Sequence, residues 1–291
     1  MDTDGVMFPH IFRYEISPHI SVYLECKGVL HSSQSRFQKI EVVESLDFGR
    51  MLVLDGVINL TERDEFVYHE MLVHVPLFSH PDPLKILIVG GGDGGTAREV
   101  LKHEEIDRIR QVEIDREVIA VSKKYFPSLG IALDHPKVNV LLTDAIQYVR
   151  EIEETFDIIL VDSTDPVIEQ SEGLFSVPFY RHCLNALTEQ GILAAQVGDI
   201  SFETNLVSAV FNKLKEVFPV VRIYLAPIPS YTLVPYSFAF CSKTIHPEMG
   251  LGLSRFGGSF QTRYYNPQIH QAAFVLPEHL RKEFGKERSV D

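Results

Sequence analysis

A glycine-rich segment at residues 90–95 is the first place in this 291-residue chain where the residue types could do chemistry. Glycines between a strand and a helix let a nucleotide approach the backbone, although a tight structural turn needs the same residues. Asp93 lies inside this segment. An acid here would repel a pyrophosphate, so a dinucleotide is disfavoured and a cationic ligand without phosphate fits better.

Two later acids could complete a nucleoside site. Glu113 lies roughly 20 residues beyond the glycines, where an acid can accept both hydroxyls of a ribose. Asp144 could accept the exocyclic amine of an adenine. Each of them could instead cap the helix that follows, and Asp115 could take that role beside Glu113. Because glycines, Glu113 and Asp144 end three successive expected strands, we expect them to bind an adenosine together.

Asp162 and Asp165 follow another expected strand, three positions apart. Together with Asp93 they would place three carboxylates around one cleft. A capped turn explains Asp165 alone but not all three acids. Such a cluster is costly unless a cation neutralises it, so the sequence predicts a positively charged ligand.

The pattern of apolar runs indicates how these residues are positioned. From residue 85 onward, expected strands at 85–89, 109–114, 138–142, 156–161 and 191–196 alternate with helices, which predicts a mostly parallel sheet covered on both faces. Segments 220–225 and 236–241 are expected to close the sheet, with an antiparallel edge. Ligands then bind at the carboxyl ends of the strands.

The first part of the chain has a different pattern. Short expected strands at 20–24 and 40–43 precede a hairpin whose strands, 51–54 and 57–60, flank Asp55-Gly56, a strong two-residue turn. A helical pattern covers residues 62–80. We therefore expect two domains, an antiparallel β-domain over residues 1–61 and an α/β catalytic domain over residues 62–291.

Composition excludes several classes of protein. The chain has 27 Lys+Arg and 40 Asp+Glu, a formal charge of −13, which argues against binding nucleic acid or an anionic membrane surface. The sequence shows neither an apolar run of the ~18–20 residues of a membrane span nor a signal peptide, so we expect a cytoplasmic protein. The 3 cysteines imply no disulfide framework.

His69 and His74 are five apart and lie on different faces of a helix, so we expect no zinc site there.

Several motifs resemble the polyamine aminopropyltransferases, the spermidine synthases. The glycine segment with Glu99 matches their signature, and agreement extends from about residue 15 to about residue 280. The remaining motifs that carry the resemblance are 61–66, 68–71, 162–166, 263–267, His270 and Ala273-Phe274. The resemblance implies a methyltransferase-like Rossmann fold behind a small antiparallel β-domain, a homodimer or homotetramer, and no metal or other cofactor. The implied reaction transfers an aminopropyl group from decarboxylated S-adenosylmethionine to putrescine, which yields spermidine and methylthioadenosine.

The resemblance also implies roles for individual residues. Asp162 would be the catalytic base, and Asp93 would bind the amine of the donated group. The donor would contact Gln38, Leu54, His69, Gly90, Gly91, Gly92, Asp93, Glu113, Asp144, Ala145 and Ser163. The acceptor would contact Tyr68, Asp93, Asp162, Asp165, Gln170, Gln196 and Tyr231.

Elementary chemistry agrees with this implied reaction. An alkylammonium must lose a proton before its nitrogen can attack the carbon beside a sulfonium, and a positioned base such as Asp162 contributes typically ~10²–10⁴-fold. The same carboxylates would repel the carboxylate of intact S-adenosylmethionine.

The acceptor amine is the open point. The chain has no Trp, although relatives often carry one near the diamine, and segments 167–173 and 231–234 differ from the family pattern. Agmatine, cadaverine or spermidine therefore stay alternatives to putrescine. A methyltransferase and a binding protein without turnover are the alternative functions, although a methyltransferase does not account for Asp93, Asp162 and Asp165 together.

Overall fold

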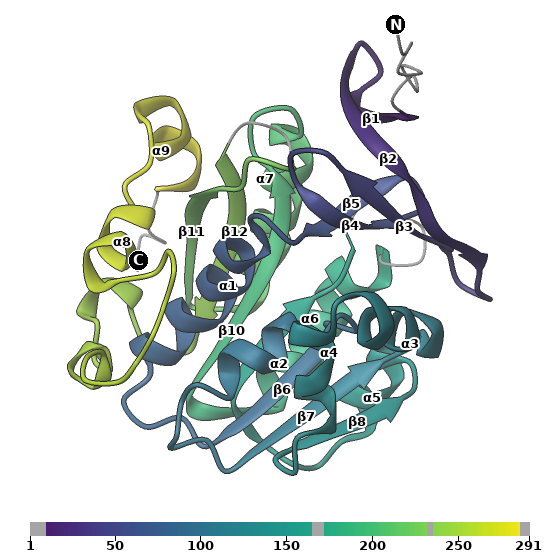
Figure 1. Cartoon of the computed structure of the whole chain (residues 1–291). Helices are drawn as coiled ribbons and strands as arrows, with labels where there is room; N and C mark the ends of the chain where they lie inside the picture. The colour runs from purple at the N-terminus through teal and green to yellow at the C-terminus, as the bar shows by residue number, and fades with distance from the viewer. Residues whose placement is uncertain (1–9, 165–171, 232–234, 286–291) are drawn as a thin grey trace, which may run out of the picture.

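The computed structural model describes residues 10–164, 172–231 and 235–285, which form two β-sheets with helices around the larger one (Figure 1). The predicted architecture is confirmed, because a small antiparallel sheet precedes a mostly parallel α/β sheet. None of the helices in these three ranges is long and apolar enough to cross a membrane.

The first sheet contains five antiparallel strands in the order in which they follow along the chain. They are β1 (His10–Ser17), β2 (Ile20–Gln34), β3 (Lys39–Ser45), β4 (Gly49–Leu54) and β5 (Val57–Thr61). The predicted hairpin turn joins β4 and β5, and Asp55 and Gly56 both have positive φ angles, 49° and 84°. This is the backbone conformation that the tightest hairpins need, and it explains an Asp-Gly pair at this point.

The second sheet has seven strands in the order β11-β12-β10-β9-β6-β7-β8. Their bounds are β6 (Lys85–Gly90), β7 (Arg108–Glu113), β8 (Val138–Leu142), β9 (Phe156–Asp162), β10 (Leu187–Asp199), β11 (Val220–Pro227) and β12 (Pro235–Ser242). The sequence predicted that the antiparallel strand would lie at the edge of the sheet. It lies inside the sheet instead, because β12 pairs antiparallel with both β10 and β11. Strand β11 is therefore the edge strand, and it runs parallel to β10.

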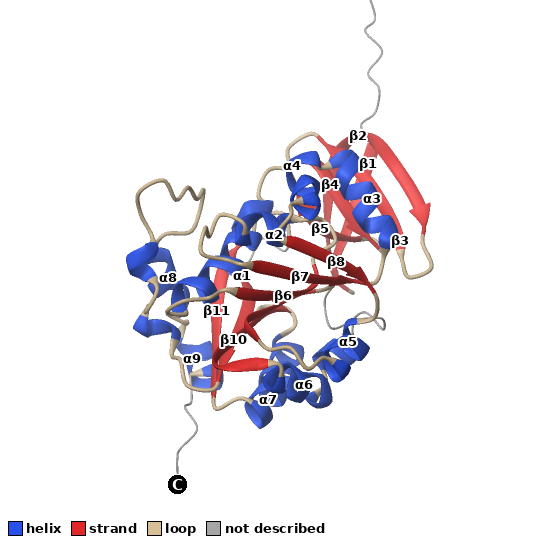
Figure 2. Ribbon diagram, turned by 90° about the horizontal axis from the view of Figure 1, so that it is seen from below, coloured by secondary structure: helices blue, strands red, loops and turns tan. Residues whose placement is uncertain are grey.

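Helices cover both faces of this sheet (Figure 2). The α-helices are α1 (Glu65–Ser79), α2 (Gly95–Val100), α3 (Arg116–Tyr125), α4 (Pro127–Gly130), α5 (Ala145–Glu151), α6 (Val177–Asn185), α7 (Thr204–Val217), α8 (Pro267–Ala273) and α9 (Glu278–Phe284). Short 3₁₀ helices are η1 (Ile131–Asp134), η2 (Glu172–Phe175), η3 (Pro247–Met249) and η4 (Leu253–Arg255). Helix α2 ends at Val100, and the N–H groups of Lys102 and His103 bond carbonyls three residues back in a turn.

The alternation of side chains along β6 shows how the two faces are filled. Ile86 and Ile88 belong to the core under α1 and α2, whereas Leu87 and Val89 belong to the core under α5, α6 and α7. A strand that is apolar on both sides must be covered on both sides, which is why its sequence is a continuous apolar run.

Helix α1 is buried on nearly all sides between the sheet and the C-terminal segment. Its Glu70 is fully buried, and its carboxylate accepts the backbone N–H groups of Arg263, Tyr264 and Tyr265, each at 2.8 Å. Two of the motifs that carried the family resemblance thus meet here in a structural role, since Glu70 fixes the C-terminal segment against α1.

The small sheet lies against the carboxyl ends of the parallel strands, where the predicted site residues are. Val118 and Val121 of α3 pack with Val42 of β3 and Leu52 of β4 in one apolar cluster. This contact holds the first sheet over the strand ends (Figure 1). Residues of both sheets line a cavity between them.

Candidate active site

A cavity of about 330 Å³ lies between the small sheet and the carboxyl ends of β6, β7, β8 and β9. The order of the large sheet reverses here, because β6 has β7 on one side and β9 on the other, and such a point is where open α/β sheets bind ligands. The predicted residues that line the cavity are Gln38, Leu54, Tyr68, His69, Gly90, Gly91, Gly92, Asp93, Glu113, Asp144, Ala145, Asp162, Ser163 and Tyr231. Most of the predicted site residues therefore line this cavity.

Two positions of the 90–95 loop need glycine because neighbouring strand ends lie too close to leave room for a side chain. Gly90 has a φ of +82°, and a Cβ there would lie 2.1 Å from the carbonyl oxygen of Asp162. A Cβ on Gly92 would lie 2.8 Å from Oε2 of Glu113. The absence of side chains therefore brings the ends of β6, β7 and β9 together around one space.

Glu113 and Asp144 differ in how they use their carboxylates. Asp115 caps α3 by accepting the N–H of Glu117 at 2.9 Å, so Glu113 is not needed as a cap. Glu113 accepts the N–H of Asp115 at 2.8 Å, and burial raises its pKa to about 7. Asp144 both lines the cavity and caps α5, accepting the N–H of Ile146 at 2.7 Å. For Asp144 the binding and capping interpretations are compatible.

Asp162 is buried at the end of β9 and held by two hydroxyls. Oδ1 accepts the Tyr68 hydroxyl at 2.7 Å, and Oδ2 accepts the Thr96 hydroxyl at 2.6 Å. Burial, and next the nearby charge of Asp93, raise the pKa of Asp162. A carboxylate with a raised pKa, fixed in orientation by two donors, is suited to accept a proton. Thr96 was not predicted, because its only signal was its place at the start of α2.

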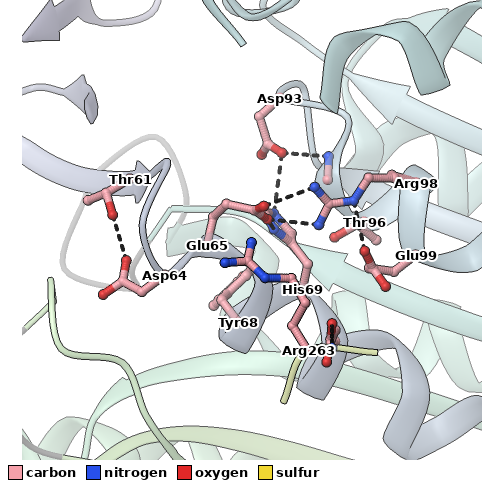
Figure 3. Close-up of polar contacts among 12 residues, drawn as sticks. Thr61, Asp64, Glu65, Tyr68, His69, Asp93, Thr96, Arg98, Glu99 and Arg263 are labelled. Carbon is pink, nitrogen blue, oxygen red and sulfur yellow. Dashed lines mark hydrogen bonds and ion pairs between the residues drawn. The ribbon is translucent and has the colours of Figure 1, made fainter. Parts of the chain in front are cut away.

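His69, predicted only as a contact of the donor, is buried among acids that favour its positive charge. His69 is on the cavity side of α1, with Nδ1 2.7 Å from Oε2 of Glu65 and Nε2 3.3 Å from Oδ1 of Asp93 (Figure 3). Ionised carboxylates only accept hydrogen bonds, so the two acids on either side of the ring favour its protonated, imidazolium form. Burial alone would lower the pKa of His69, but the charges of Asp93 and Glu65 outweigh it and raise the pKa well above its ordinary value.

Glu65 is itself held in place by a second ion pair. Arg98 of α2 forms a bidentate ion pair with Glu65, in which Nη1 contacts Oε1 and Nη2 contacts Oε2, both at 2.9 Å (Figure 3). The side chain of Glu65 is only 7% exposed, so this pair orients it strongly toward His69. The four-residue spacing of Glu65 and His69 on one helix face was the signal that could have revealed the pair.

One group of residues in the described ranges has the composition of a metal site. Ligand atoms of His69, Asp93 and Asp162 lie within 4.8 Å of one another. A metal would have to compete with the proton that Asp93 and Glu65 favour on His69. His74, five residues on, faces away from this group, with Nε2 3.0 Å from Glu99 and Nδ1 3.0 Å from His103. The two histidines therefore have separate sets of partners.

Gln196 is placed differently from the prediction. It does not line the cavity in the described part of the chain. Its Nε2 donates to the carbonyls of Ser163 and Thr164, at 2.9 and 3.0 Å, and its Oε1 accepts the Tyr236 hydroxyl at 2.7 Å. Tyr236 takes the position in the wall, and Gln196 supports it. Asp165 and Gln170 lie outside the described residues.

Comparisons with known proteins agree with this geometry. Residues 65–250 match the model of the spermine/spermidine synthase domain, and residues 11–62 match the spermidine synthase tetramerisation domain. The chain is 45% identical over 273 residues to the polyamine aminopropyltransferase of Desulforudis audaxviator, covering 94% of this chain and 98% of that one. The corresponding enzyme of Bacillus cereus is 43% identical over 267 residues, covering 92% and 96%.

Solved structures give the same result. A spermidine synthase in complex with the transition-state analogue AdoDATO superimposes with a TM-score of 0.90 at 36% identity, covering 95% of this chain and 96% of that one. The spermidine synthase of Thermotoga maritima superimposes with a TM-score of 0.87 at 35% identity, covering 95% of each chain.

Proposed function

The chain belongs to the spermine/spermidine synthase family and is an aminopropyl-transferring enzyme, and on that basis we propose that it uses putrescine as its acceptor. The donor is decarboxylated S-adenosylmethionine, and the products are spermidine and methylthioadenosine. The observation that carries this proposal is that two acids, the partly buried Asp93 and the buried Asp162, lie in one cavity together with Glu113 and Asp144.

The donor occupies the part of the cavity next to the glycine loop. Glu113 accepts hydrogen bonds from the ribose hydroxyls, and Asp144 accepts a hydrogen bond from the exocyclic amine of the adenine. Ala145 lies beside the adenine ring. Asp93 pairs with the ammonium at the end of the aminopropyl group. The other residues that contact the donor are Gln38, Leu54, His69, Gly90, Gly91, Gly92 and Ser163.

The transfer is a single displacement. Asp162 accepts a proton from the acceptor's ammonium, and the freed nitrogen lone pair attacks the methylene beside the sulfonium. The carbon–sulfur bond breaks, and its electrons leave with sulfur, which becomes the neutral thioether of methylthioadenosine. Tyr68 supports this role because its hydroxyl keeps the Asp162 carboxylate in one orientation. Alignment of nitrogen, carbon and sulfur supplies much of the remaining acceleration.

The acceptor binds in the part of the cavity next to Asp162. We place Tyr68, Asp93, Asp162 and Tyr231 against it, and extend this to Asp165 and Gln170 from the family resemblance. Gln196 acts on the acceptor only through Tyr236, because it lies behind that side chain.

The reaction needs no metal or organic cofactor, because the positively charged sulfur leaves as a neutral thioether without further activation. We propose a homodimer or homotetramer, supported by the match of residues 11–62 to a tetramerisation domain. We also place the enzyme in the cytoplasm, and the free, buried state of Cys26, Cys183 and Cys241 fits a reducing compartment.

A competition assay tests the choice of acceptor. The enzyme is incubated with decarboxylated S-adenosylmethionine and equal concentrations of putrescine, agmatine, cadaverine and spermidine in buffer containing a metal chelator. We expect mass spectrometry to show spermidine as the main product. A larger amount of any other aminopropylated amine would contradict putrescine as the acceptor. Product that forms only after a metal is restored would contradict the cofactor-free reaction.

A further inference from the structure

Asp64 is the N-cap residue of helix α1, but its side chain does not cap the helix. An aspartate at this position ordinarily accepts a backbone N–H from the first turn with its carboxylate. Here the carbonyl oxygen of Asp64 accepts the N–H of Val67 at 3.0 Å, and the carboxylate forms no cap hydrogen bond. The residue is only 5% exposed, so the carboxylate is buried without serving its own helix. It therefore needs another explanation.

The carboxylate of Asp64 joins three segments of the chain. Oδ1 accepts the hydroxyl of Thr61, at the end of β5, at 2.6 Å (Figure 3). The same oxygen accepts the hydroxyl of Ser230 at 2.8 Å, and Oδ2 accepts the backbone N–H of Ser230, also at 2.8 Å. Hydrogen bonds to a charged group are stronger than those between neutral groups. One buried carboxylate thus ties the segment that follows β11 to the junction of the small sheet and α1.

This tie fixes the start of a side chain in the cavity wall. Ser230 belongs to a turn at residues 228–231, because the N–H of Tyr231 bonds the carbonyl three residues back at 3.1 Å. Tyr231 lines the cavity, and its hydroxyl donates a hydrogen bond to the backbone carbonyl of Asn59 in β5. Asp64 therefore holds the backbone end of Tyr231, whereas Asn59 holds the hydroxyl end.

The ring of Tyr231 lies beside the carboxylate that accepts the proton. Its centroid is 6.0 Å from that of Tyr68 and 5.1 Å from that of Tyr236, and all three rings line the cavity. The Tyr68 hydroxyl bonds Asp162. Aromatic faces suit both methylene groups and ammonium groups, so a displacement of Tyr231 would remove one side of the surface on which an alkylamine lies.

Asp64 has no direct contact with this space. Among the described residues, the cavity wall includes Tyr231 but neither Asp64 nor Ser230. We propose that Asp64 is a positioning residue for the acceptor, whose carboxylate fixes the turn at residues 228–231 and thereby places the Tyr231 ring against the alkyl chain of the amine. This inference rests on the proposed function, which puts Tyr231 against the acceptor.

The test separates the two sides of the Asp64 carboxylate. Ser230→Ala removes the hydroxyl that bonds Oδ1 from the side of the turn. Asp64→Asn is the second variant, because an amide has one oxygen and can keep both hydroxyl bonds only by turning its NH₂ group toward the N–H of Ser230. Thr61→Val is the matched control, since it removes a hydrogen bond from the same oxygen and leaves both bonds to Ser230 in place.

We expect Ser230→Ala and Asp64→Asn each to raise the KM for putrescine about tenfold, the factor that corresponds to one hydrogen bond to a charged group. The kcat and the KM for the donor should stay within about twofold of wild type, because only binding of the acceptor is weakened. Thr61→Val should keep both KM values of the wild type, although its melting temperature should fall as much as that of Ser230→Ala. A role of Asp64 in stability alone would make these two variants alike in every measurement.

An unchanged KM for putrescine in Ser230→Ala and Asp64→Asn would overturn the positioning role of Asp64. An equal rise in Thr61→Val, or a parallel rise in the KM for the donor, would also overturn it. The proposed function would stand in each of these cases, since the wild type still makes spermidine. A wild-type enzyme that makes no spermidine from putrescine would instead overturn the proposed function, and the inference with it. The product of the wild type therefore distinguishes the two failures.

Discussion

Asp162→Asn is expected to lower kcat by about 10²–10⁴-fold, the range that a positioned general base contributes, and to leave donor affinity nearly unchanged. Asn can still accept one of the hydrogen bonds that Tyr68 and Thr96 now donate to the carboxylate. The variant therefore removes the proton acceptor while the surroundings of the side chain stay largely in place.

The dependence of the rate on pH sharpens this prediction. Burial and the charge of Asp93 raise the pKa of Asp162 in the folded protein, and only the ionised form can accept a proton. The wild-type rate should therefore fall as the pH decreases through this raised pKa, and that acidic limb should be absent from Asp162→Asn. Single-turnover kinetics with donor and putrescine across pH measure both effects. A variant with full activity would show that Asp162 is not the base.

Asp93→Asn is expected to raise the KM for the donor by about 10–100-fold. The carboxylate is the proposed partner of the donor's primary ammonium, and a hydrogen bond to a charged group contributes about 1.5–3 kcal/mol, where each 1.36 kcal/mol is a factor of ten. Asn can keep the bond from the N–H of Gly95, now 2.6 Å from Oδ1 of Asp93. The change therefore tests the charge and not the loop.

Methylthioadenosine supplies the control for this second prediction, because it contains the nucleoside but lacks the aminopropyl group. Calorimetric titration of Asp93→Asn should show weaker binding of decarboxylated S-adenosylmethionine and unchanged binding of methylthioadenosine. Equal weakening of both ligands would mean that the substitution disturbs the glycine loop. Unchanged binding of both would mean that Asp93 does not bind the donor's amine.

The sequence predicted that the glycine loop, Glu113 and Asp162 lie together, and it did so for a physical reason. Gly90, Glu113 and Asp162 end three strands that are parallel, and the carboxyl ends of parallel strands meet at one edge. Their convergence therefore follows from the alternation of strands and helices. The order of the strands does not, because the apolar runs of β11 and β12 look alike whether a strand is central or at the edge.

The acceptor side was harder to predict because the backbone is irregular there. The pairing of β10 with β12 shifts register between Gln196 and Gly198, and a bulge of this kind reverses which residues face the cavity. The alternation of side chains up to Gln196 therefore cannot be extended to Asp199, which lines the cavity. His69 was predicted to contact the donor, but its charge depends on Glu65 and Asp93, which are brought together only by the fold.

The most direct test of the account is to identify the products formed from two competing donors. The enzyme is given putrescine with equal concentrations of decarboxylated and intact S-adenosylmethionine, and the products are weighed by mass spectrometry. Because the carboxylates of Asp93 and Asp162 in the cavity repel the carboxylate of the intact donor, we predict spermidine and methylthioadenosine in equal amounts, with no methylated putrescine. Methylated putrescine together with S-adenosylhomocysteine would contradict the account.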